Sequence, residues 1–177
     1  MSLNQLSPAP ISEPDESTVC GVMTPPESAA DFLEGQDPLG TPKLSTSSVP
    51  WPRSTFIIRS ASTGQVLALD AGRVLLCPPG GRGSIHWACV DSKGWLGFRN
   101  VVSGKFLGHD KNGKLRCEAD RVQEWEKFCV RITPEGGFVL LMTHWERLWQ
   151  VGITMERGLE RLAKIGEAGI VWEFVKT

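Results

Sequence analysis

Short apolar runs alternate with turn-forming residues along the second part of the chain. Around the turn at residues 110–113, Leu115 and Cys117 alternate with Lys114 and Arg116, so one face is apolar and the other basic. Similar runs occur at residues 56–58, 66–69, 74–77, 85–90, 95–98 and 138–142. This period-two pattern, interrupted by Asn-Gly, Ser-Gly and Pro-Pro turn signals, predicts an all-β fold made of hairpins.

Three of the apolar runs form a repeat. The apolar pairs 66–67, 106–107 and 148–149 lie 40 and 42 residues apart, and each is followed by a tryptophan that opens a further strand. A period near 40 predicts three related units, and a single hairpin buries too little apolar surface to fold alone. We therefore expect one shared core, anchored by Trp87, Trp125 and Trp172.

One segment is ambiguous between helix and strand. In residues 155–165, Leu159, Leu162 and Ala163 have helical spacing. However, Leu162 precedes Trp172 by ten residues, as Leu115 precedes Trp125. The repeat therefore favours a hairpin here as well.

The middle unit resembles a known family. Residues 104–118 read Gly-Lys-Phe-Leu-Gly-His-Asp-Lys-Asn-Gly-Lys-Leu-Arg-Cys-Glu, which is similar to a repeat of the fascin-type β-trefoil domains. The wider superfamily includes ricin-type lectins and fibroblast growth factors. The resemblance extends over about residues 55–175 and implies a β-trefoil with pseudo-threefold hairpin repeats. In that fold six strands form a barrel and six cap one end as three hairpins.

Composition divides the chain into a tail and a domain. Residues 1–50 contain 8 of the 12 prolines, seven acidic residues and one lysine, a net charge of −6. Such a segment cannot bury enough apolar area to offset chain entropy, so we expect a disordered, acidic, Pro/Ser-rich tail. Residues 51–177 carry a net charge of +5 and are long enough for one core, the expected β-trefoil domain.

The compartment is predicted from cysteines and apolar runs. The five cysteines are odd in number and have no framework spacing, which favours a reducing environment. The first residues lack the basic start and apolar core of a secretory signal, and no run approaches 18 apolar residues. We expect a cytoplasmic protein, with a nuclear location as the alternative, that is not secreted and has no membrane partner.

No residue set for catalysis is evident. His86, His109 and His144 fall in no known catalytic frame, and on a strand His86 and Cys89 point to opposite faces. We therefore expect no enzyme activity, no cofactor and no metal site.

The first function hypothesis is a non-catalytic interaction module that binds an acidic protein. Six basic residues, Arg121 among them, fall in the middle repeat, and five are the candidate contacts; strand parity points Lys114 and Arg116 away from the core. The fascin resemblance implies actin filaments as the acidic partner, although nearby acidic residues leave a simple solvated face as the alternative. A charge of +5 without a basic run argues against nucleic acid. The five candidate contacts are Arg99, Lys105, Lys111, Lys114 and Arg116.

The alternative hypothesis is a carbohydrate-binding lectin. Gln123-Glu124-Trp125 fits the Gln-x-Trp motif of ricin-type trefoils. Asp70 and Asp110 fall near the place where that family carries a sugar-binding Asp, so the resemblance implies this role for them. The motif departs from the family in the other repeats, which have Ile85 and Ile170 instead of Gln.

Overall fold

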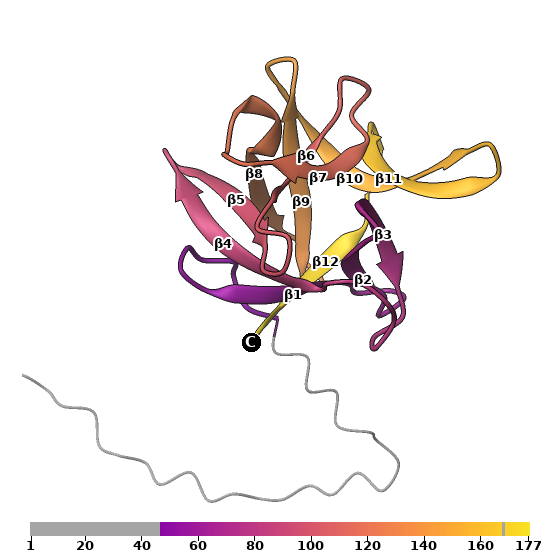
Figure 1. Cartoon of the computed structure of the whole chain (residues 1–177), viewed down its shortest axis with the longest axis horizontal. Helices are drawn as coiled ribbons and strands as arrows, with labels where there is room; N and C mark the ends of the chain where they lie inside the picture. The colour runs from indigo at the N-terminus through magenta and orange to yellow at the C-terminus, as the bar shows by residue number, and fades with distance from the viewer. Residues whose placement is uncertain (1–46, 168) are drawn as a thin grey trace, which may run out of the picture. The chain divides into compact units, whose positions relative to one another are not determined.

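The fold was analysed in a computed structural model that describes residues 47–167 and 169–177. These residues all belong to one compact unit (Figure 1). They form twelve strands and one short 3-10 helix, η1, at Glu124–Glu126. The strands are β1 Thr55–Ser60, β2 Val66–Asp70, β3 Arg73–Cys77, β4 His86–Ser92, β5 Trp95–Asn100, β6 Phe106–His109, β7 Leu115–Ala119, β8 Phe128–Ile132, β9 Phe138–His144, β10 Arg147–Glu156, β11 Leu159–Ile165 and β12 Val171–Lys176.

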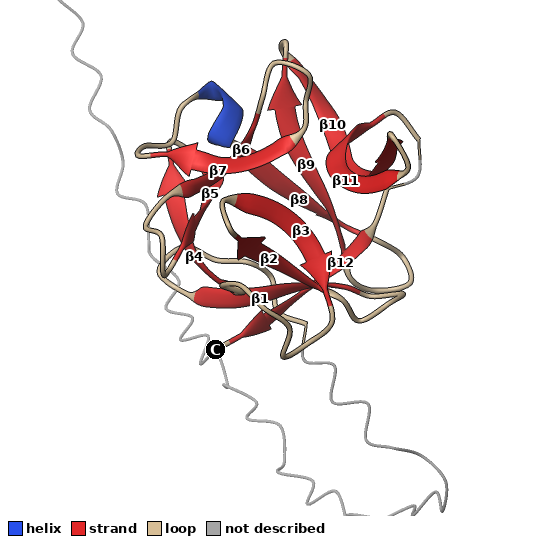
Figure 2. Ribbon diagram, turned by 45° about the vertical axis from the view of Figure 1, so that its right-hand side comes forward, coloured by secondary structure: helices blue, strands red, loops and turns tan. Residues whose placement is uncertain are grey.

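Six of the strands close into a barrel. The antiparallel pairs run β1–β4, β4–β5, β5–β8, β8–β9, β9–β12 and back from β12 to β1, so every barrel strand has two partners. The other six strands pair as the hairpins β2–β3, β6–β7 and β10–β11 (Figure 2). The fold is a β-trefoil, and the predicted fold class is confirmed.

The predicted tail falls almost entirely outside the described residues. Within the described part, the chain contacts the barrel from Ser47, which forms a bridge with Val175. The N–H of Ser48 donates to the carbonyl oxygen of Phe174 over 2.8 Å. The contacts with β12 thus begin before residue 51, where the domain was expected to start.

Trp87, Phe128 and Trp172 are fully buried in the barrel. Trp87 and Trp172 lie opposite Asn100 and Ser60, the last residues of β5 and β1, so these two indoles occupy equivalent steps. Phe128 lies opposite Met142, two residues before the end of β9, and its equivalents are Cys89 and Phe174. The pseudo-threefold relation therefore joins Trp87 and Trp172 with Glu126, two residues before Phe128.

The prediction that Trp125 is a core anchor is wrong. Trp125 is 38% exposed, whereas Phe128, three residues later, is completely buried. The chain forms η1 before it enters β8, and the Glu126 carboxylate accepts the N–H of Gln123 to close that turn. The turn leaves the Trp125 indole at the surface, while Phe128 packs in the core beside Phe98.

The alignment of the third repeat also needs a correction. Leu67 and Leu107 are fully buried in the hairpin cap, and their counterpart is Val151 instead of Trp149. Leu67, Leu107 and Val151 each stand seven positions after the last residue of the preceding barrel strand, Ser60, Asn100 or His144. The shift arises before β9, because the β8–β9 connection has five residues, 133–137, where β4–β5 has two. Leu148 is 48% exposed. The β10–β11 hairpin confirms the strand prediction for residues 155–165.

The buried indoles differ in their hydrogen bonds. Trp87 donates its Nε1–H to the Leu67 carbonyl oxygen over 2.9 Å, which ties the barrel to the first cap hairpin. The Nε1–H of Trp172 has no acceptor among the described residues. Of these two core indoles, Trp87 alone thus has a hydrogen-bond acceptor within the described residues.

The cysteines of the described part are free. Cys77, Cys89 and Cys117 are buried and Cys129 is half-buried. Burial raises the pKa of the Cys89 thiol to about 12 and that of Cys117 to about 11, so both side chains behave as small apolar groups. No helix among the described residues is long and apolar enough to span a bilayer.

The corrected core makes a stability prediction. We expect Phe128→Ala to lower the free energy of unfolding by about 3–5 kcal/mol, because it leaves a cavity in the barrel. Trp125→Ala, which removes only a half-exposed stacking contact, should cost about 1 kcal/mol. Urea denaturation followed by circular dichroism measures both values. Equal losses in the two variants would contradict the assignment of Phe128 to the core.

Candidate functional site

The five candidate basic residues of the middle repeat are mostly engaged. Lys105 forms an ion pair with Asp120 at 2.6 Å, and Arg99 donates from Nε to the Gly104 carbonyl oxygen at 2.7 Å. Lys114 pairs with Glu156 of β10 at 2.5 Å. The positive charges of Lys105 and Lys114 are thus neutralised by carboxylates, and Arg99 is bonded within its own loop. Less free positive charge remains for a partner than the sequence suggested.

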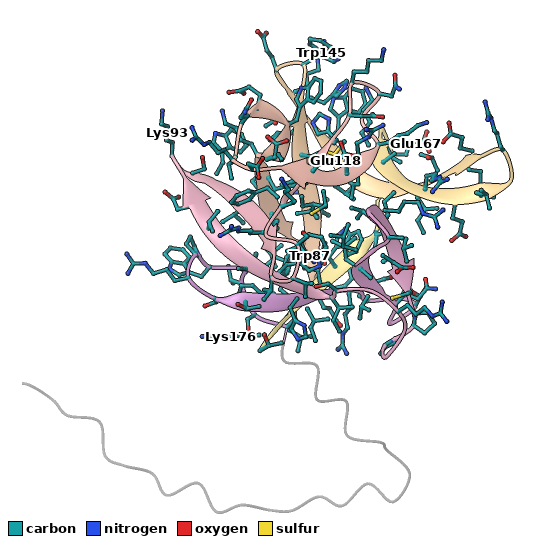
Figure 3. The ribbon with its side chains drawn as sticks, viewed as in Figure 1. Trp87, Lys93, Glu118, Trp145, Glu167 and Lys176 are labelled. Carbon is teal, nitrogen blue, oxygen red and sulfur yellow. The ribbon has the colours of Figure 1, made fainter. Side chains whose placement is uncertain are left out.

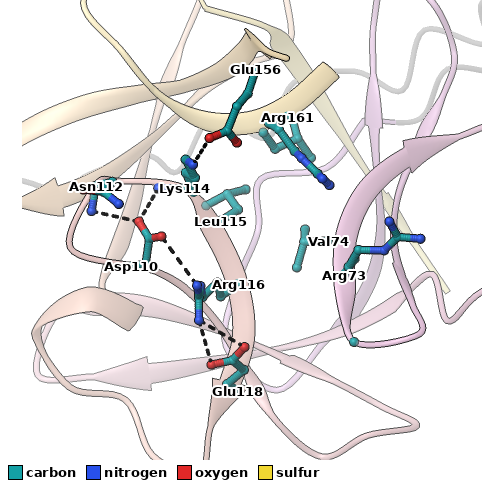
Figure 4. Close-up of a pocket in the computed structure, with 12 residues that line it drawn as sticks. Arg73, Val74, Asp110, Asn112, Lys114, Leu115, Arg116, Glu118, Glu156 and Arg161 are labelled. Carbon is teal, nitrogen blue, oxygen red and sulfur yellow. Dashed lines mark hydrogen bonds and ion pairs between the residues drawn. The ribbon is translucent and has the colours of Figure 1, made fainter. Parts of the chain in front are cut away.

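Two of the five residues, Lys114 and Arg116, line a common pocket. It has a volume of about 440 Å³ and is enclosed by the three cap hairpins, so we call it the axial pocket (Figure 4). Arg116 reaches Asp110 at 3.7 Å and Glu118 at 3.4 Å. The pocket is lined by Gly72, Arg73, Val74, Asp110, Asn112, Lys114, Leu115, Arg116, Glu118, Glu156, Arg161 and Leu162.

Asp110 and Asp70 do not form one site. Asp110 Oδ1 accepts the N–H groups of Asn112 at 2.8 Å and Lys114 at 3.0 Å, which holds the β6–β7 turn. Partial burial raises the pKa of the Asp110 carboxyl, but these two N–H groups and Arg116 outweigh it, so the net pKa is lowered. Asp70 ends β2 opposite Arg73 and does not line the axial pocket.

A second pocket, of about 480 Å³, is lined by three tryptophans. We call it the tryptophan pocket, and neither Asp70 nor Asp110 belongs to it. Figure 3 shows Trp145 at the outer tip of the β9–β10 turn, in contrast to the enclosed Trp87. The lining residues are Trp95, Glu124, Trp125, Thr143, His144, Trp145, Glu146, Arg147 and Leu148.

The turn that carries Trp145 has an unusual backbone. His144 pairs with Arg147, so Trp145 and Glu146 form a two-residue turn, with φ of 49° and 61°. Such turns need positive φ at both positions and normally place glycine at the second. The three other two-residue turns do so, at Gly72, Gly94 and Gly158. Left-handed backbone costs a non-glycine residue about 1–2 kcal/mol, and such outliers gather at functional sites.

Trp125, which forms part of the wall of the tryptophan pocket, packs on a buried histidine side chain. Its indole stacks on the buried imidazole of His109 with ring centroids 5.5 Å apart, and His109 in turn lies 5.1 Å from the ring of His144. The ring nitrogens of His109 face two carbonyl oxygens, of Asp110 at 2.8 Å and Thr143 at 2.5 Å. His109 is therefore fixed in orientation and holds Trp125 in place.

Close backbone packing keeps η1 against β6. A Cβ atom at Gly108 would lie 2.7 Å from the Glu126 carboxylate and 3.0 Å from the Trp125 carbonyl oxygen, so glycine is required there. Burial raises the pKa of the Glu126 carboxyl, opposed by the Gln123 N–H and the nearby His109. The loop that carries Trp125 is thus anchored by groups buried beneath it.

The tryptophan pocket combines apolar faces with charged groups. Trp145 is 71% exposed, and Glu146 and Arg147 form no ion pair within the described residues. Sequence reasoning missed this site because it assigned Trp125 to the core. The available signal was the Trp-Glu pair between two strand-like runs, where a tight turn would normally carry Asn-Gly. No three His, Cys, Asp or Glu side chains in the described part are grouped to hold a metal ion.

The comparisons with known proteins confirm the fold. No family model and no curated protein matches the sequence. A ricin B-like lectin from Macrolepiota procera, solved with lactose, is similar over 73% of this chain and 100% of its own, with TM-score 0.57 and 12% identity. The designed threefold-symmetric protein ThreeFoil is similar over 68% of this chain and 97% of its own, with TM-score 0.55 and 14% identity.

A glycosidase contains a similar domain. The GlcNAcα1-4Gal-releasing endo-β-galactosidase from Clostridium perfringens is similar over 70% of this chain, with TM-score 0.59 and 12% identity. The matched region covers 32% of that enzyme, so this chain spans about a third of its length. The β-trefoil part of the predicted resemblance is confirmed, and its fascin-like type stays a prediction.

The turn role of Asp110 makes a second prediction. Asp110→Ala should lower the free energy of unfolding by about 1–2 kcal/mol, because two backbone N–H groups lose their acceptor. Asp110→Asn keeps an acceptor oxygen and should cost less. Because the folded pKa of Asp110 is lowered, its charge stabilises the fold above the unfolded carboxyl pKa and stops doing so as the pH falls.

Urea denaturation at pH 7 and at successively lower pH values measures these differences. The gap between wild type and Asp110→Asn should close as the pH falls below about 4. A gap that stays constant, or an Asp110→Asn variant as unstable as Asp110→Ala, would contradict the turn role.

Proposed function

We propose that this β-trefoil is a non-catalytic carbohydrate-binding module, with the tryptophan pocket as its binding site. The observation that carries the proposal is Trp145, which is 71% exposed at a turn whose backbone favours glycine. Folding alone gains nothing from this choice, since the Asn-Gly turns that hairpins prefer would be more stable. A ligand that contacts the indole explains it.

The pocket has the chemistry that a pyranose ring requires. One face of many hexoses presents C–H groups, and it packs on flat aromatic side chains such as Trp125 and Trp145. Hydroxyl groups at the ring edge need charged or polar partners, which Glu146 and Arg147 supply. A volume of about 480 Å³ is in the range of small-molecule sites.

The similar proteins support this reading. One is a lectin that was solved with lactose and another is an enzyme that acts on a galactose-containing glycan. Trefoils also host unrelated functions, so the site residues of this chain carry more weight than the shared fold. Those residues differ from Asp70 and Asp110, which the ricin-type resemblance implied.

An acidic protein partner, actin filaments included, is the second candidate. Its support is the net charge of +5 in residues 51–177 and the resemblance of residues 104–118 to fascin-type repeats. The ion pairs of Lys105, Lys114 and Arg116 weaken it, because they leave less positive potential for a partner.

The carbohydrate proposal predicts selective loss of sugar binding. The full chain should give signals on a glycan array, and lactose is the first probe for titration calorimetry. Trp145→Ala and Trp125→Ala should each weaken binding at least tenfold, because each removes one stacking face. Trp51→Ala is the matched control, since Trp51 is also 71% exposed but lies outside the pocket.

Two results would reject the carbohydrate proposal. One is an array without signal, and the other is a ligand whose affinity is unchanged in Trp145→Ala. Cosedimentation with actin filaments at low salt, tested in parallel, would then decide for the second candidate.

The positive φ angles of Trp145 and Glu146 predict that a more stable turn sequence would bind sugar less well. Replacing Trp145-Glu146 by Asn-Gly should raise the free energy of unfolding by about 1 kcal/mol, because it relieves left-handed backbone at Glu146. The same change should abolish sugar binding. Denaturation and calorimetry on one protein preparation measure both effects. Ala71→Asn, in a turn that already has Gly72, should leave binding unchanged.

A further inference from the structure

The trefoil symmetry brings three cations to one axis. Val74, Leu115 and Leu162 are equivalent buried residues on the second strands of the three cap hairpins. The residue before each of them is basic, and these residues are Arg73, Lys114 and Arg161. All three line the axial pocket. The repeat pattern therefore concentrates positive charge where the hairpins meet.

The pocket has an apolar floor and a charged wall. The floor consists of the buried side chains of Val74, Leu115 and Leu162, and the volume is about 440 Å³. In Figure 4 Arg161 extends over the pocket from β11, while Arg73 stands on β3 at the edge of the pocket with its exposed side chain turned outward. A hexose-sized molecule fits such a space, with its ring above the floor.

The ion pairs of the pocket leave two guanidinium groups without a direct carboxylate contact. Lys114 is held by Glu156, and Arg116 by Asp110 and Glu118, as the dashed lines in Figure 4 show. Within the described residues neither Arg73 nor Arg161 forms an ion pair. The charge of the half-buried Arg161 acts on Glu156 from a distance and helps to lower its pKa, but Glu156 gives its direct contact to Lys114.

We propose that the axial pocket binds a small molecule that carries a tetrahedral oxyanion, a phosphate or sulfate monoester, between Arg73 and Arg161. Guanidinium groups bind such oxyanions through paired N–H donors. Asn112 offers a further amide at the rim. This site is separate from the tryptophan pocket and does not depend on the proposed carbohydrate function.

The charge balance limits the size of the ligand. Four basic side chains and three carboxylates line the pocket, a net charge of +1. A sulfate monoester, with a charge of −1, matches that excess, and a phosphate monoester, with about −1.5 to −2, exceeds it by no more than about one charge. Asp110, Glu118 and Glu156 would repel an extended polyanion. The ligand class is therefore a singly phosphorylated or sulfated small molecule, and nucleic acid or a sulfated polysaccharide fits poorly.

The test uses the full chain and three matched probes, glucose 6-phosphate, glucose 6-sulfate and glucose, in calorimetry at low salt. The phosphate or sulfate ester should bind and glucose should not, and the ratio of the two ester affinities distinguishes a phosphorylated from a sulfated ligand. Arg73→Gln and Arg161→Gln should each weaken binding about fivefold to tenfold, because each removes a charge-assisted hydrogen-bond partner. Arg82→Gln is the control, since Arg82 is an exposed arginine outside the pocket.

A variant that gains affinity tests the site in a way that misfolding cannot imitate, because misfolding can only reduce binding. Glu156→Gln removes the carboxylate that holds Lys114, so it should strengthen binding of the ester about threefold or more. The proposal is overturned if neither ester binds, or if Arg161→Gln binds like wild type. It is also overturned if Glu156→Gln weakens binding, or if Arg82→Gln loses as much affinity as the pocket variants.

Discussion

Closure of the barrel is the constraint on which the remaining structure depends. Six strands enclose a narrow interior that Trp87 and Trp172 enter at equivalent steps, while Phe128 packs at the next level with Phe98 and Phe174. Because the barrel has no free edge, its six strands must keep a common register. Differences between the repeats are therefore confined to the connections and the cap.

The two pockets differ in their relation to the threefold symmetry of this barrel. The axial pocket uses the symmetry, since equivalent residues of three hairpins meet at one place. The tryptophan pocket breaks it, because η1 is present before β8 and the β9–β10 turn is shorter than its counterparts. Phe128 satisfies the core in the second repeat, so Trp125 is free to line a surface site.

The sequence predicted the strands and their order well, because alternation reports which face of a strand is buried. Leu115 and Cys117 are buried and Arg116 is exposed, as the pattern indicated. The role of Trp125 could not be predicted, since an indole is equally compatible with a core and with a binding surface. The placement of Arg73 and Arg161 along one pocket could not be predicted either. These residues are 88 positions apart in the sequence and come to the same pocket only through the trefoil topology.

The two-residue β9–β10 turn has a consequence for valency. The corresponding connections of the other repeats, residues 61–65 and 101–105, are longer and contain no tryptophan. Within the described residues, one repeat in three thus presents an aromatic turn, so under the proposed function a single domain would engage one glycan end without cross-linking two. Avidity would come from bringing several such domains together, since linked sites raise the effective concentration of the second contact.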